Sequence, residues 1–409
     1  MAATRLPLAL LAVAALVAAA LALPGADTPP PLRIGAVHAL SGVMAGSERG
    51  LVDALHMAVD EINGTGGLLG RKVELVVADS ASDWSQAAAG AEHLITAEGV
   101  EALFGCWTSS CRKALLPVVE RHHHLLFYPL QYEGLENSSH IVYMGAAPNQ
   151  QIIPGARWAF ERFGPRIYLL GSDYVFPRTA NQLVRDLLDA AGGTVAGERY
   201  LPLQASAADV DAAVAEIRRL SPDVVLNTIN GEANVHLFAA LARHGALDVP
   251  VLSFSLGEPE LLQLRELPYH PRHHAVWNYF QSVPGRANAT FVESFRARYG
   301  AERVVSDPMR SSYDAVRLWA AAVRAQGGAE PRRVLSAIGR VSVDGADGVV
   351  ILDAATRHLW RRVYVGHARR DGQFDIEELS ATPVRPAPFP PYRSREEWLH
   401  LGEHGGAPQ

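Results

Sequence analysis

The chain has 409 residues, of which 48% are apolar and 20% are charged, and its formal charge at pH 7 is −6. This composition is typical of a folded globular protein and excludes a disordered or fibrous chain. The charge is mild and no long run of Lys or Arg occurs, so the sequence predicts no nucleic acid and no anionic membrane surface as a partner.

Residues 1–31 differ from the rest of the chain. Arg5 precedes an Ala/Leu/Val run from Leu6 to Leu23, and Ala20-Leu21-Ala22 has the small-x-small pattern of a cleavage site. We therefore expect a signal peptide, cut after Ala22, and a linker. The run is also close to the shortest length that spans a bilayer, which leaves an uncleaved N-terminal membrane anchor open. In both cases the folded part lies in the periplasm or another extracytoplasmic space.

From residue 32 onward, apolar runs of strand length alternate with amphipathic segments of helix length, and short polar connections separate them. The first series has strands at 33–40 and 72–78, one that ends at Phe104-Gly105-Cys106 and one at 125–128. Its helices are at 48–63, 84–97 and from Ser109 or Ser110 to about His122. A second series with the same alternation runs from Ile153 to Phe254. This pattern predicts two α/β lobes, each with a doubly wound parallel sheet.

We expect the chain to cross between these lobes more than once. The expected division is a first lobe at 32–148 with 276–345 returning to it, a second lobe at 149–275 with 346–381 returning to it, and a C-terminal tail at 382–409. The tail is rich in proline and is expected to wrap the surface without regular structure.

Polar and aromatic side chains follow several of the predicted strands, at the sheet edge where open α/β folds bind ligands. The set is Trp107, Thr108, Ser109, Tyr128, Gln131, Asp173, Tyr174 and Asn230. Ser109 or Ser110 is placed to cap a helix, whose free N–H groups favour a carbonyl oxygen or an anion. Each residue also has a purely structural interpretation: Ser109 and Asp173 as helix caps, Trp107 and Tyr128 as core aromatics, and Asn230 as part of a turn.

The two cysteines, Cys106 and Cys111, are five residues apart, and an exported protein can form a disulfide. Because one is expected to end a strand and the other to lie in a helix, we favour two packed thiols. The histidine runs at 122–124 and 273–274 are interpreted as solvated positions, since adjacent helical residues point in different directions. We expect no metal and no cofactor.

Several segments together resemble the type I periplasmic solute-binding proteins of ABC transporters, and within them the branch that binds urea and short-chain amides. These segments are FGCWTSSCRKALLPVVE, LFYPLQYEGLE, GAAPNQQIIPG, LGSDYVFPRTAN and LNTINGEANV. The resemblance covers about Arg33 to Ala381. It implies two lobes on three hinge strands that enclose a small neutral solute and hand it to ABC permease subunits. The His122-His123-His124 run, the Arg-rich late part and the extended polar C-terminus depart from the family pattern.

Urea has one carbonyl acceptor, four N–H donors and no net charge, so its site needs few donors and several acceptors. Ser109 and helix N–H groups suit the oxygen, while Gln131, Asp173 and Asn230 suit the N–H groups. Trp107, Tyr128 and Tyr174 suit the walls. The alternative function is an extracytoplasmic amide or urea sensor that reports to a signalling partner. An amide hydrolase using Cys106, Glu133 and Lys113 has no supporting motif, so we do not expect an enzyme.

Overall fold

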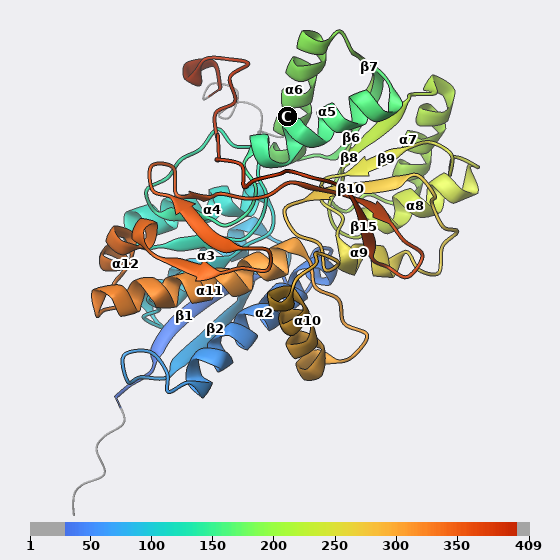
Figure 1. Ribbon diagram of the computed structural model, residues 1–409. Helices are drawn as coiled ribbons and strands as arrows, with labels where there is room; N and C mark the ends of the chain where they lie inside the picture. The colour runs from blue at the N-terminus through green and yellow to red at the C-terminus, as the bar shows by residue number, and fades with distance from the viewer. Residues whose placement is uncertain (1–28, 399–409) are drawn as a thin grey trace, which may run out of the picture.

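The computed structural model describes residues 29–398, which form two lobes, each built around one β-sheet (Figure 1). The expected signal peptide, its cleavage site and the alternative membrane anchor lie almost wholly outside these residues. Within residues 29–398, no helix combines the length and the apolar composition that crossing a bilayer requires.

The sheet of the first lobe has eight strands in the order β11-β12-β13-β5-β4-β3-β1-β2. Its central strands are short and buried on both faces, which suits parallel strands covered by helices. The strands are β1 (Leu32–His38), β2 (Val73–Asp79), β3 (Leu103–Gly105), β4 (Leu126–Tyr128), β5 (Ile141–Tyr143), β11 (Ser342–Asp344), β12 (Val349–Asp353) and β13 (His358–Leu359).

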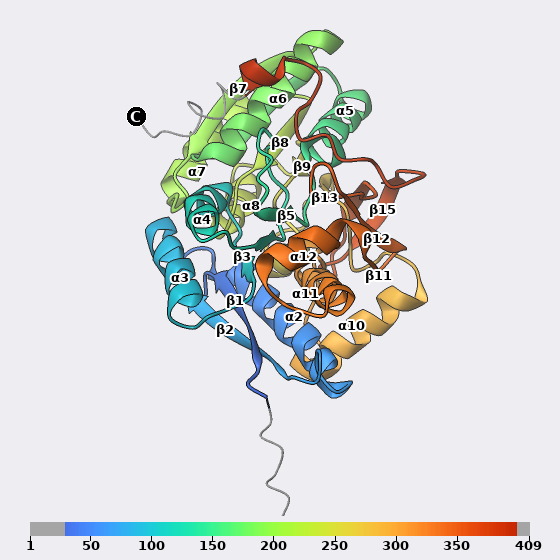
Figure 2. The same cartoon turned by 90° about the vertical axis from the view of Figure 1, so that its left-hand side faces the viewer.

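Helices cover both faces of this sheet, with α3 and α4 on one face and α2 and α11 on the other (Figure 2). The helices of this lobe are α2 (Ala45–Gly64), α3 (Trp84–Thr96), α4 (Ser109–Arg121), α10 (Arg286–Tyr299), α11 (Asp307–Gln326), α12 (Pro331–Ala337) and the 3-10 turn η2 (Ile338–Arg340).

The second lobe has a seven-stranded sheet in the order β15-β14-β10-β9-β8-β6-β7. Its strands are β6 (Arg166–Ser172), β7 (Thr194–Leu201), β8 (Val224–Thr228), β9 (Val251–Ser253), β10 (His273–Trp277), β14 (Tyr364–Ala368) and β15 (Phe374–Leu379). Its helices are η1 (Pro148–Gln150), α5 (Ile152–Phe163), α6 (Val175–Ala191), α7 (Ala207–Leu220), α8 (Ala233–Arg243) and α9 (Glu258–Gln263). Two such lobes confirm the predicted fold class.

The expected return of residues 346–381 to the second lobe is wrong for its first part. Strands β12 and β13 form an antiparallel pair, and β13 extends the first sheet through His358, which pairs with Tyr143 of β5. Only β14 and β15 join the second sheet. The position of this pair is set by tertiary packing, because the edge strand that accepts it is distant in the sequence.

The chain passes between the sheets at three places, and one side chain forms hydrogen bonds that link these three connections. Asn278, in the second crossing, donates its side-chain N–H groups to the carbonyl oxygens of Gln150 at 2.9 Å and Arg362 at 2.6 Å, which belong to the first and third crossings. Its backbone N–H donates to Asp307 at 3.1 Å. The three connections therefore share one hydrogen-bonded junction, as expected for a hinge.

Glu258, the first residue of α9, is buried beside this junction. Its Oε1 accepts the backbone N–H of Gln281 at 2.7 Å, and its Oε2 has no partner within the described residues. Burial raises the pKa of Glu258 from 4.5 to about 8, and burial raises the pKa of Asp307 to about 6. The folded protein thus holds protons that the unfolded chain releases between pH 5 and pH 8. Stability contributed by these groups is present below the unfolded pKa and is lost as pH rises.

We therefore expect Glu258→Gln to flatten the fall in the free energy of unfolding between pH 5 and pH 8, because it removes one of the two titrating carboxyls. The free energy of unfolding of the variant, measured by denaturation with guanidinium chloride, should equal that of the wild type at pH 5 and exceed it at pH 8. Glu302→Gln, which changes an exposed carboxyl, is the control. Parallel pH profiles for wild type and Glu258→Gln would contradict the burial argument.

The C-terminal segment is anchored at defined points on both lobes. The backbone N–H of Leu135 donates to the carbonyl oxygen of Pro388 at 2.8 Å, and Arg385 pairs with Asp353 at 3.0 Å. Farther along, Arg393 contacts Asp186 of α6 through two hydrogen bonds of 2.6 and 2.7 Å. Residues 395–398 form a helical turn, and the fully buried Trp398 packs in the core of the second lobe. The expectation of a tail without regular structure is therefore wrong for residues 395–398.

Trp398→Ala should lower the free energy of unfolding by about 3 kcal/mol, because it empties a buried site of aromatic size. The C-terminal segment can detach while the rest of the protein stays folded. The loss therefore cannot exceed the free energy that docking of this segment contributes. Trp360→Ala is the matched control, since the Trp360 side chain is 37% exposed, and its effect should stay within about 1 kcal/mol. Equal losses for the two variants in chemical denaturation would show that Trp398 adds no docking energy.

Candidate functional site

The loop between β3 and α4 places the first three candidate residues. Thr108, and not Ser109 or Ser110, is the N-cap of α4, because its Oγ1 accepts the backbone N–H of Cys111 at 3.1 Å. Ser109 is the first helical residue, and its hydroxyl is free for other contacts. The expectation that Ser109 or Ser110 caps the helix is therefore wrong by one residue. The first-turn N–H groups of α4 nevertheless lie where we expected them.

Cys106 and Cys111 form a disulfide, so the favoured interpretation of two packed thiols is wrong. Their Cα atoms are 6.2 Å apart, which is within disulfide range. Thr108 in extended backbone conformation turns the chain between the strand end and the helix, and this turn brings the two residues together. The bridge closes the loop that carries Trp107, Thr108 and Ser109.

A buried ionic cluster lies next to this loop, centred on the fully buried Arg112. Its guanidinium donates to Glu136 at 2.9 Å, to the Ser109 hydroxyl at 2.9 Å and to Glu133 at 2.9 Å. The Ser109 hydroxyl in turn donates to the other oxygen of Glu133 at 2.5 Å. The rings of Tyr128 and Tyr132 flank the guanidinium at 5.0 and 4.6 Å.

Charge pairing outweighs burial in this cluster. Burial alone would lower the pKa of Arg112, but Glu136 and Glu133 raise it well above its ordinary value. Burial would likewise raise the pKa of Glu136, yet Arg112 and Lys113 hold that pKa below its ordinary value. One cation therefore faces two carboxylates in the buried part of the cluster, and Arg112 is occupied by its own protein partners.

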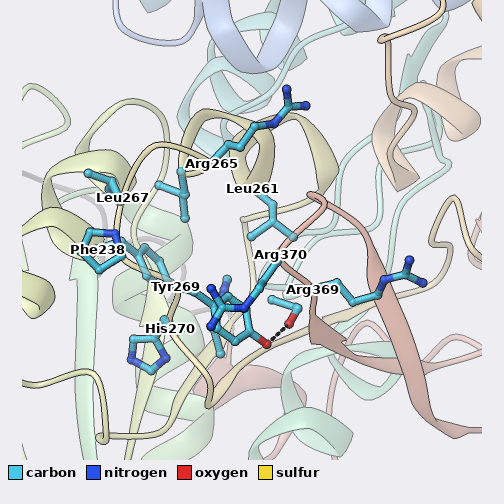
Figure 3. Close-up of a pocket in the computed structure, with 12 residues that line it drawn as sticks. Phe238, Leu261, Arg265, Leu267, Tyr269, His270, Arg369 and Arg370 are labelled. Carbon is cyan, nitrogen blue, oxygen red and sulfur yellow. Dashed lines mark hydrogen bonds between the residues drawn. The ribbon is translucent and has the colours of Figure 1, made fainter.

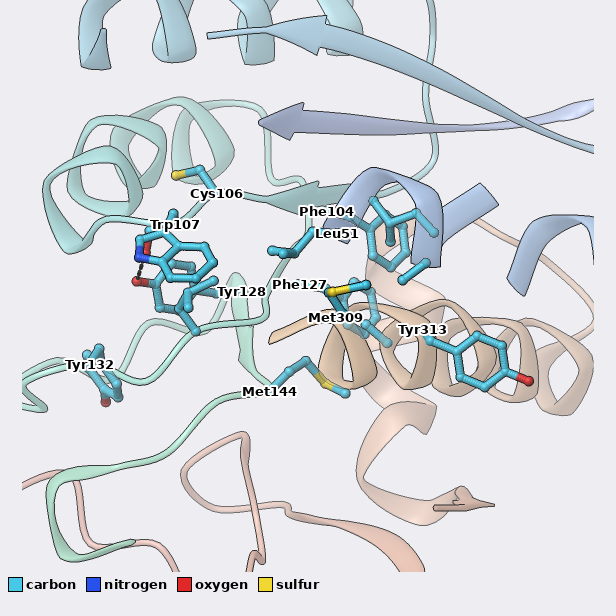
Figure 4. Close-up of a cluster of buried hydrophobic side chains, with 14 of the residues drawn as sticks. Leu51, Phe104, Cys106, Trp107, Phe127, Tyr128, Tyr132, Met144, Met309 and Tyr313 are labelled. Atoms are coloured by element: carbon cyan, nitrogen blue, oxygen red, sulfur yellow. Dashed lines mark hydrogen bonds between the residues drawn. The ribbon is translucent and has the colours of Figure 1, made fainter. Parts of the chain in front are cut away.

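Trp107, Tyr128 and Asn230 meet where the lobes touch. The indole N–H of Trp107 donates to Oδ1 of Asn230 at 3.0 Å, and the hydroxyl of Tyr128 donates to the backbone carbonyl of Trp107 at 2.7 Å. Figure 4 shows the Trp107 and Tyr128 rings close together at the end of the first-lobe core. All three side chains are buried. A first-lobe aromatic and a second-lobe amide are thus in direct contact.

The backbone at Gly231 permits this close approach. Gly231 has a φ of +68°, and a Cβ there would lie 3.0 Å from the carbonyl oxygen of Val43 in the first lobe. A larger residue would be strained and would push the lobes apart. A cavity of about 280 Å³ lies beside this contact, between Val43 and Ser47 of the first lobe and Glu232 and Glu260 of the second.

Gln131 also reaches across the lobes. Its Nε2 donates to the carbonyl oxygen of Phe254 at 3.0 Å and to the hydroxyl of Ser255 at 3.2 Å. Its Oε1 is buried and has no partner within residues 29–398. A bound solute with an N–H group would satisfy this acceptor.

Tyr174 lies close to the cluster, whereas Asp173 does not take part in it. Burial raises the pKa of the Tyr174 phenol, and Tyr128 and Glu133 raise it further, so these groups share one environment. The side chain of Asp173 is 43% exposed and pairs with Arg178 at 2.6 Å. Tyr174 rather than Asp173 occupies the N-cap position of α6, and its side chain makes no capping hydrogen bond.

Sequence reasoning missed Arg112 and Glu136, and it considered Glu133 only in the hydrolase alternative. The signal for Arg112 is its spacing from Leu115 and Val119, which are buried on the same face of α4. A charged residue at a core position of an amphipathic helix needs a buried partner. The two glutamates lie in a loop without regular structure, so no periodicity indicates them.

The histidine runs are less solvated than expected. His124 is buried and its Nε2 lies 2.8 Å from the Val100 carbonyl oxygen, whereas His122 contacts Glu92 at 2.7 Å. His273 and His274 are buried in β10. The residues with resolved placement contain no group of three His, Cys, Asp or Glu side chains suited to a metal ion.

The family profile described as a periplasmic binding protein domain matches residues 32–395. The chain belongs to this periplasmic binding protein family. A Leu/Ile/Val-binding protein homolog 8 from Brucella abortus is 25% identical over 338 residues, covering 75% of this chain and 79% of that protein. A shorter match of 28% identity over 121 residues covers 30% of this chain and only 22% of a limonene hydroxylase from Geobacillus stearothermophilus, so it carries no activity to this protein.

Solved periplasmic binding proteins share the fold. A solute-binding protein of an ABC transporter from R. palustris, in complex with benzoate, superposes with a TM-score of 0.76 at 19% identity, covering 87% of this chain and 98% of that chain. A leucine-binding protein from Thermotoga maritima gives a TM-score of 0.72 at 18% identity, covering 85% and 98%. These two solved proteins are described as a solute-binding protein of an ABC transporter and as a leucine-binding protein.

Arg112→Met should lower the free energy of unfolding by about 3–5 kcal/mol, because it leaves two buried carboxylates without their cation. Lys113→Met is the matched control: Lys113 is 37% exposed and lies 3.7 Å from Glu136, so its loss should cost no more than about 1 kcal/mol. Chemical denaturation at pH 7 measures both. Similar small losses would show that the cluster does not need Arg112.

Proposed function

We propose that this protein is the extracytoplasmic binding component of an ABC uptake transporter and that it captures urea or a short-chain aliphatic amide between its lobes. The observation that carries the proposal is the charge balance beside the interlobe contact. Arg112 makes four hydrogen bonds to Ser109, Glu133 and Glu136, so it is not available to a ligand carboxylate.

An anionic ligand fits this environment poorly. The complexes solved with benzoate and 4-hydroxybenzoate contain carboxylic acids, and a carboxylate needs donors or a free cation to replace its hydration. Here Arg112 and Lys113 are already paired with the two carboxylates, so no cation is left for a further negative charge. A neutral solute avoids this cost.

Unused acceptors favour a solute with several N–H donors. Within residues 29–398, Oε1 of Gln131 is buried without a partner, and Oδ1 of Asn230 accepts only the Trp107 indole N–H. Urea carries four N–H donors and one carbonyl, and the first-turn N–H groups of α4 suit that carbonyl. The rings of Trp107, Tyr128 and Tyr174 would provide apolar walls for a planar molecule.

The proposed site draws on both lobes, so the solute would favour their closure. Only the closed state offers Asn230 and the first-lobe residues together, and a ligand shifts an equilibrium by its differential affinity for the two states. Closure would then signal occupancy to the permease. Glu260 adds a second contact of the closed form, since its Oε1 accepts the Ser47 hydroxyl at 2.6 Å across the lobes.

Calorimetry with urea, acetamide, formamide, benzoate and leucine tests the ligand class. We expect saturable binding of urea or one of the two amides, and no binding of leucine or benzoate at the interlobe site. Asn230→Ala should weaken that binding by about 1–3 kcal/mol, roughly 5-fold to 150-fold, because it removes a buried acceptor. Asn137→Ala, at an exposed position, is the control.

Small-angle scattering tests closure on the same samples. The radius of gyration of the wild type should fall when the ligand saturates it, and Asn230→Ala should reduce this change. Binding of benzoate or leucine that Asn230→Ala weakens, with no binding of urea or amides, would overturn the proposed ligand class. An unchanged radius of gyration in wild-type protein that is saturated with ligand would instead contradict closure of the lobes.

A further inference from the structure

A separate cavity of about 210 Å³ lies at the edge of the second lobe (Figure 3). Its lining comes from α8, from the segment that includes α9 and continues to β10, and from the turn between β14 and β15. The apolar part includes Phe238, Leu261 and Leu264. Pockets for drug-sized ligands measure about 300–1,000 Å³, so this cavity admits only a small molecule.

The charged side chains around this cavity are all cationic. Arg265, Arg369 and Arg370 line it, and no Asp or Glu is among its twelve lining residues. Arg369 is occupied by Asp371 and Asp375, outside the cavity. Arg370 lies over the ring of Tyr269, with its guanidinium carbon 4.5 Å from the ring centre. Among the described residues, Arg265 and Arg370 form no ion pair, so two guanidinium groups remain for an anion.

The cavity also includes a buried donor without a partner. His270 is 5% exposed, its Nδ1 accepts the backbone N–H of Arg272 at 3.3 Å, and its Nε2 has no partner within the described residues. Burial lowers the pKa of His270 to about 4, so the ring is neutral at pH 7. In the tautomer whose Nδ1 accepts this bond, the single proton is on Nε2 and has no acceptor among the described residues. The neighbouring His273 differs, since its Nε2 lies 3.0 Å from the Ser253 hydroxyl.

We propose that this cavity is a second binding site, for the anion of a small carboxylic acid with an apolar body. The apolar part would pack against Phe238, Leu261 and Leu264. The carboxylate would pair with the guanidinium of Arg370, and rotation of the Arg265 side chain, whose guanidinium points away from Arg370 in Figure 3, would bring a second guanidinium to it. An oxygen of the bound acid would also give His270 the acceptor that it lacks.

This site is distinct from the interlobe site in both place and chemistry. All its lining residues belong to the second lobe, so binding there does not need closure. Its charge also differs: cations without carboxylates line this cavity, whereas the cations next to the interlobe contact, Arg112 and Lys113, are paired with Glu133 and Glu136. The proposal therefore stands independently of the urea or amide assignment.

Phenylacetate is a suitable probe, and methyl phenylacetate is its neutral counterpart of similar shape. We expect calorimetry on the full exported protein to show saturable binding of phenylacetate and at least tenfold weaker binding of the ester. Arg265→Gln with Arg370→Gln should weaken phenylacetate binding at least tenfold. Both side chains are exposed, so the fold should be retained. Arg324→Gln with Arg332→Gln, two exposed arginines of the first lobe, is the control and should leave binding unchanged.

NMR of protein with isotope-labelled histidine tests independently whether the acid binds in this cavity. Phenylacetate should shift the Nε2–H resonance of His270, identified by its loss in His270→Gln. Phenylacetate binding that the double Arg265→Gln and Arg370→Gln variant leaves intact would place the acid elsewhere and overturn the proposal. Absence of saturable phenylacetate binding to the wild type would overturn it as well.

Discussion

The pairing of Arg112 with Glu133 and Glu136 is the interaction on which the candidate site depends. It joins the first turn of α4 to a loop without regular structure that follows β4. Neither element could hold its position alone, because each would bury charge without compensation. Once paired, they fix Ser109 and orient Tyr128 and Tyr132 around the guanidinium. The disulfide between Cys106 and Cys111 closes the loop between β3 and α4, which carries Trp107, Thr108 and Ser109.

The two lobes are joined by connections that move together. Asn278 contacts backbone groups of two other crossings, so a rotation at one crossing is felt at all three. Buried acidic groups, Glu258 and Asp307, lie beside this junction, and their raised pKa values show that burial there outweighs the available pairing. Opening and closing of the lobes would therefore change the solvation of groups that titrate near neutral pH. The C-terminal segment adds contacts to both lobes, through Leu135 and Asp186.

Two regions of the molecule have opposite electrostatics. The interlobe contact has buried carboxylates, an arginine whose partners are all within the protein, and an amide oxygen of Gln131 without a partner in the described residues, which suit a neutral donor of hydrogen bonds. The cavity of the second lobe has two free guanidinium groups and a buried imidazole N–H, which suit an anion. One ligand class does not suit both regions. The interlobe contact has no free cation for an anion, and the second-lobe cavity has no carboxylate to accept N–H groups. The family fold provides the frame, and these local side chains decide the chemistry.

The sequence by itself determined the fold class and most of the interlobe residues. Alternation of strand and helix patterns gives the two sheets, and the rule that ligands bind at the carboxyl ends of parallel strands brings Trp107, Tyr128 and Asn230 to one edge. What only the tertiary structure decided depends on contacts between distant segments. The spacing of Arg112 indicates a core position, but its partners Glu133 and Glu136 are seen only in the structure, as is the pairing of Asp173 with Arg178. The same holds for the return of β12 and β13 to the first sheet, the disulfide between the cysteines and the burial of His270. Local sequence patterns determine whether a segment is a helix or a strand, whereas packing between distant segments determines its partners.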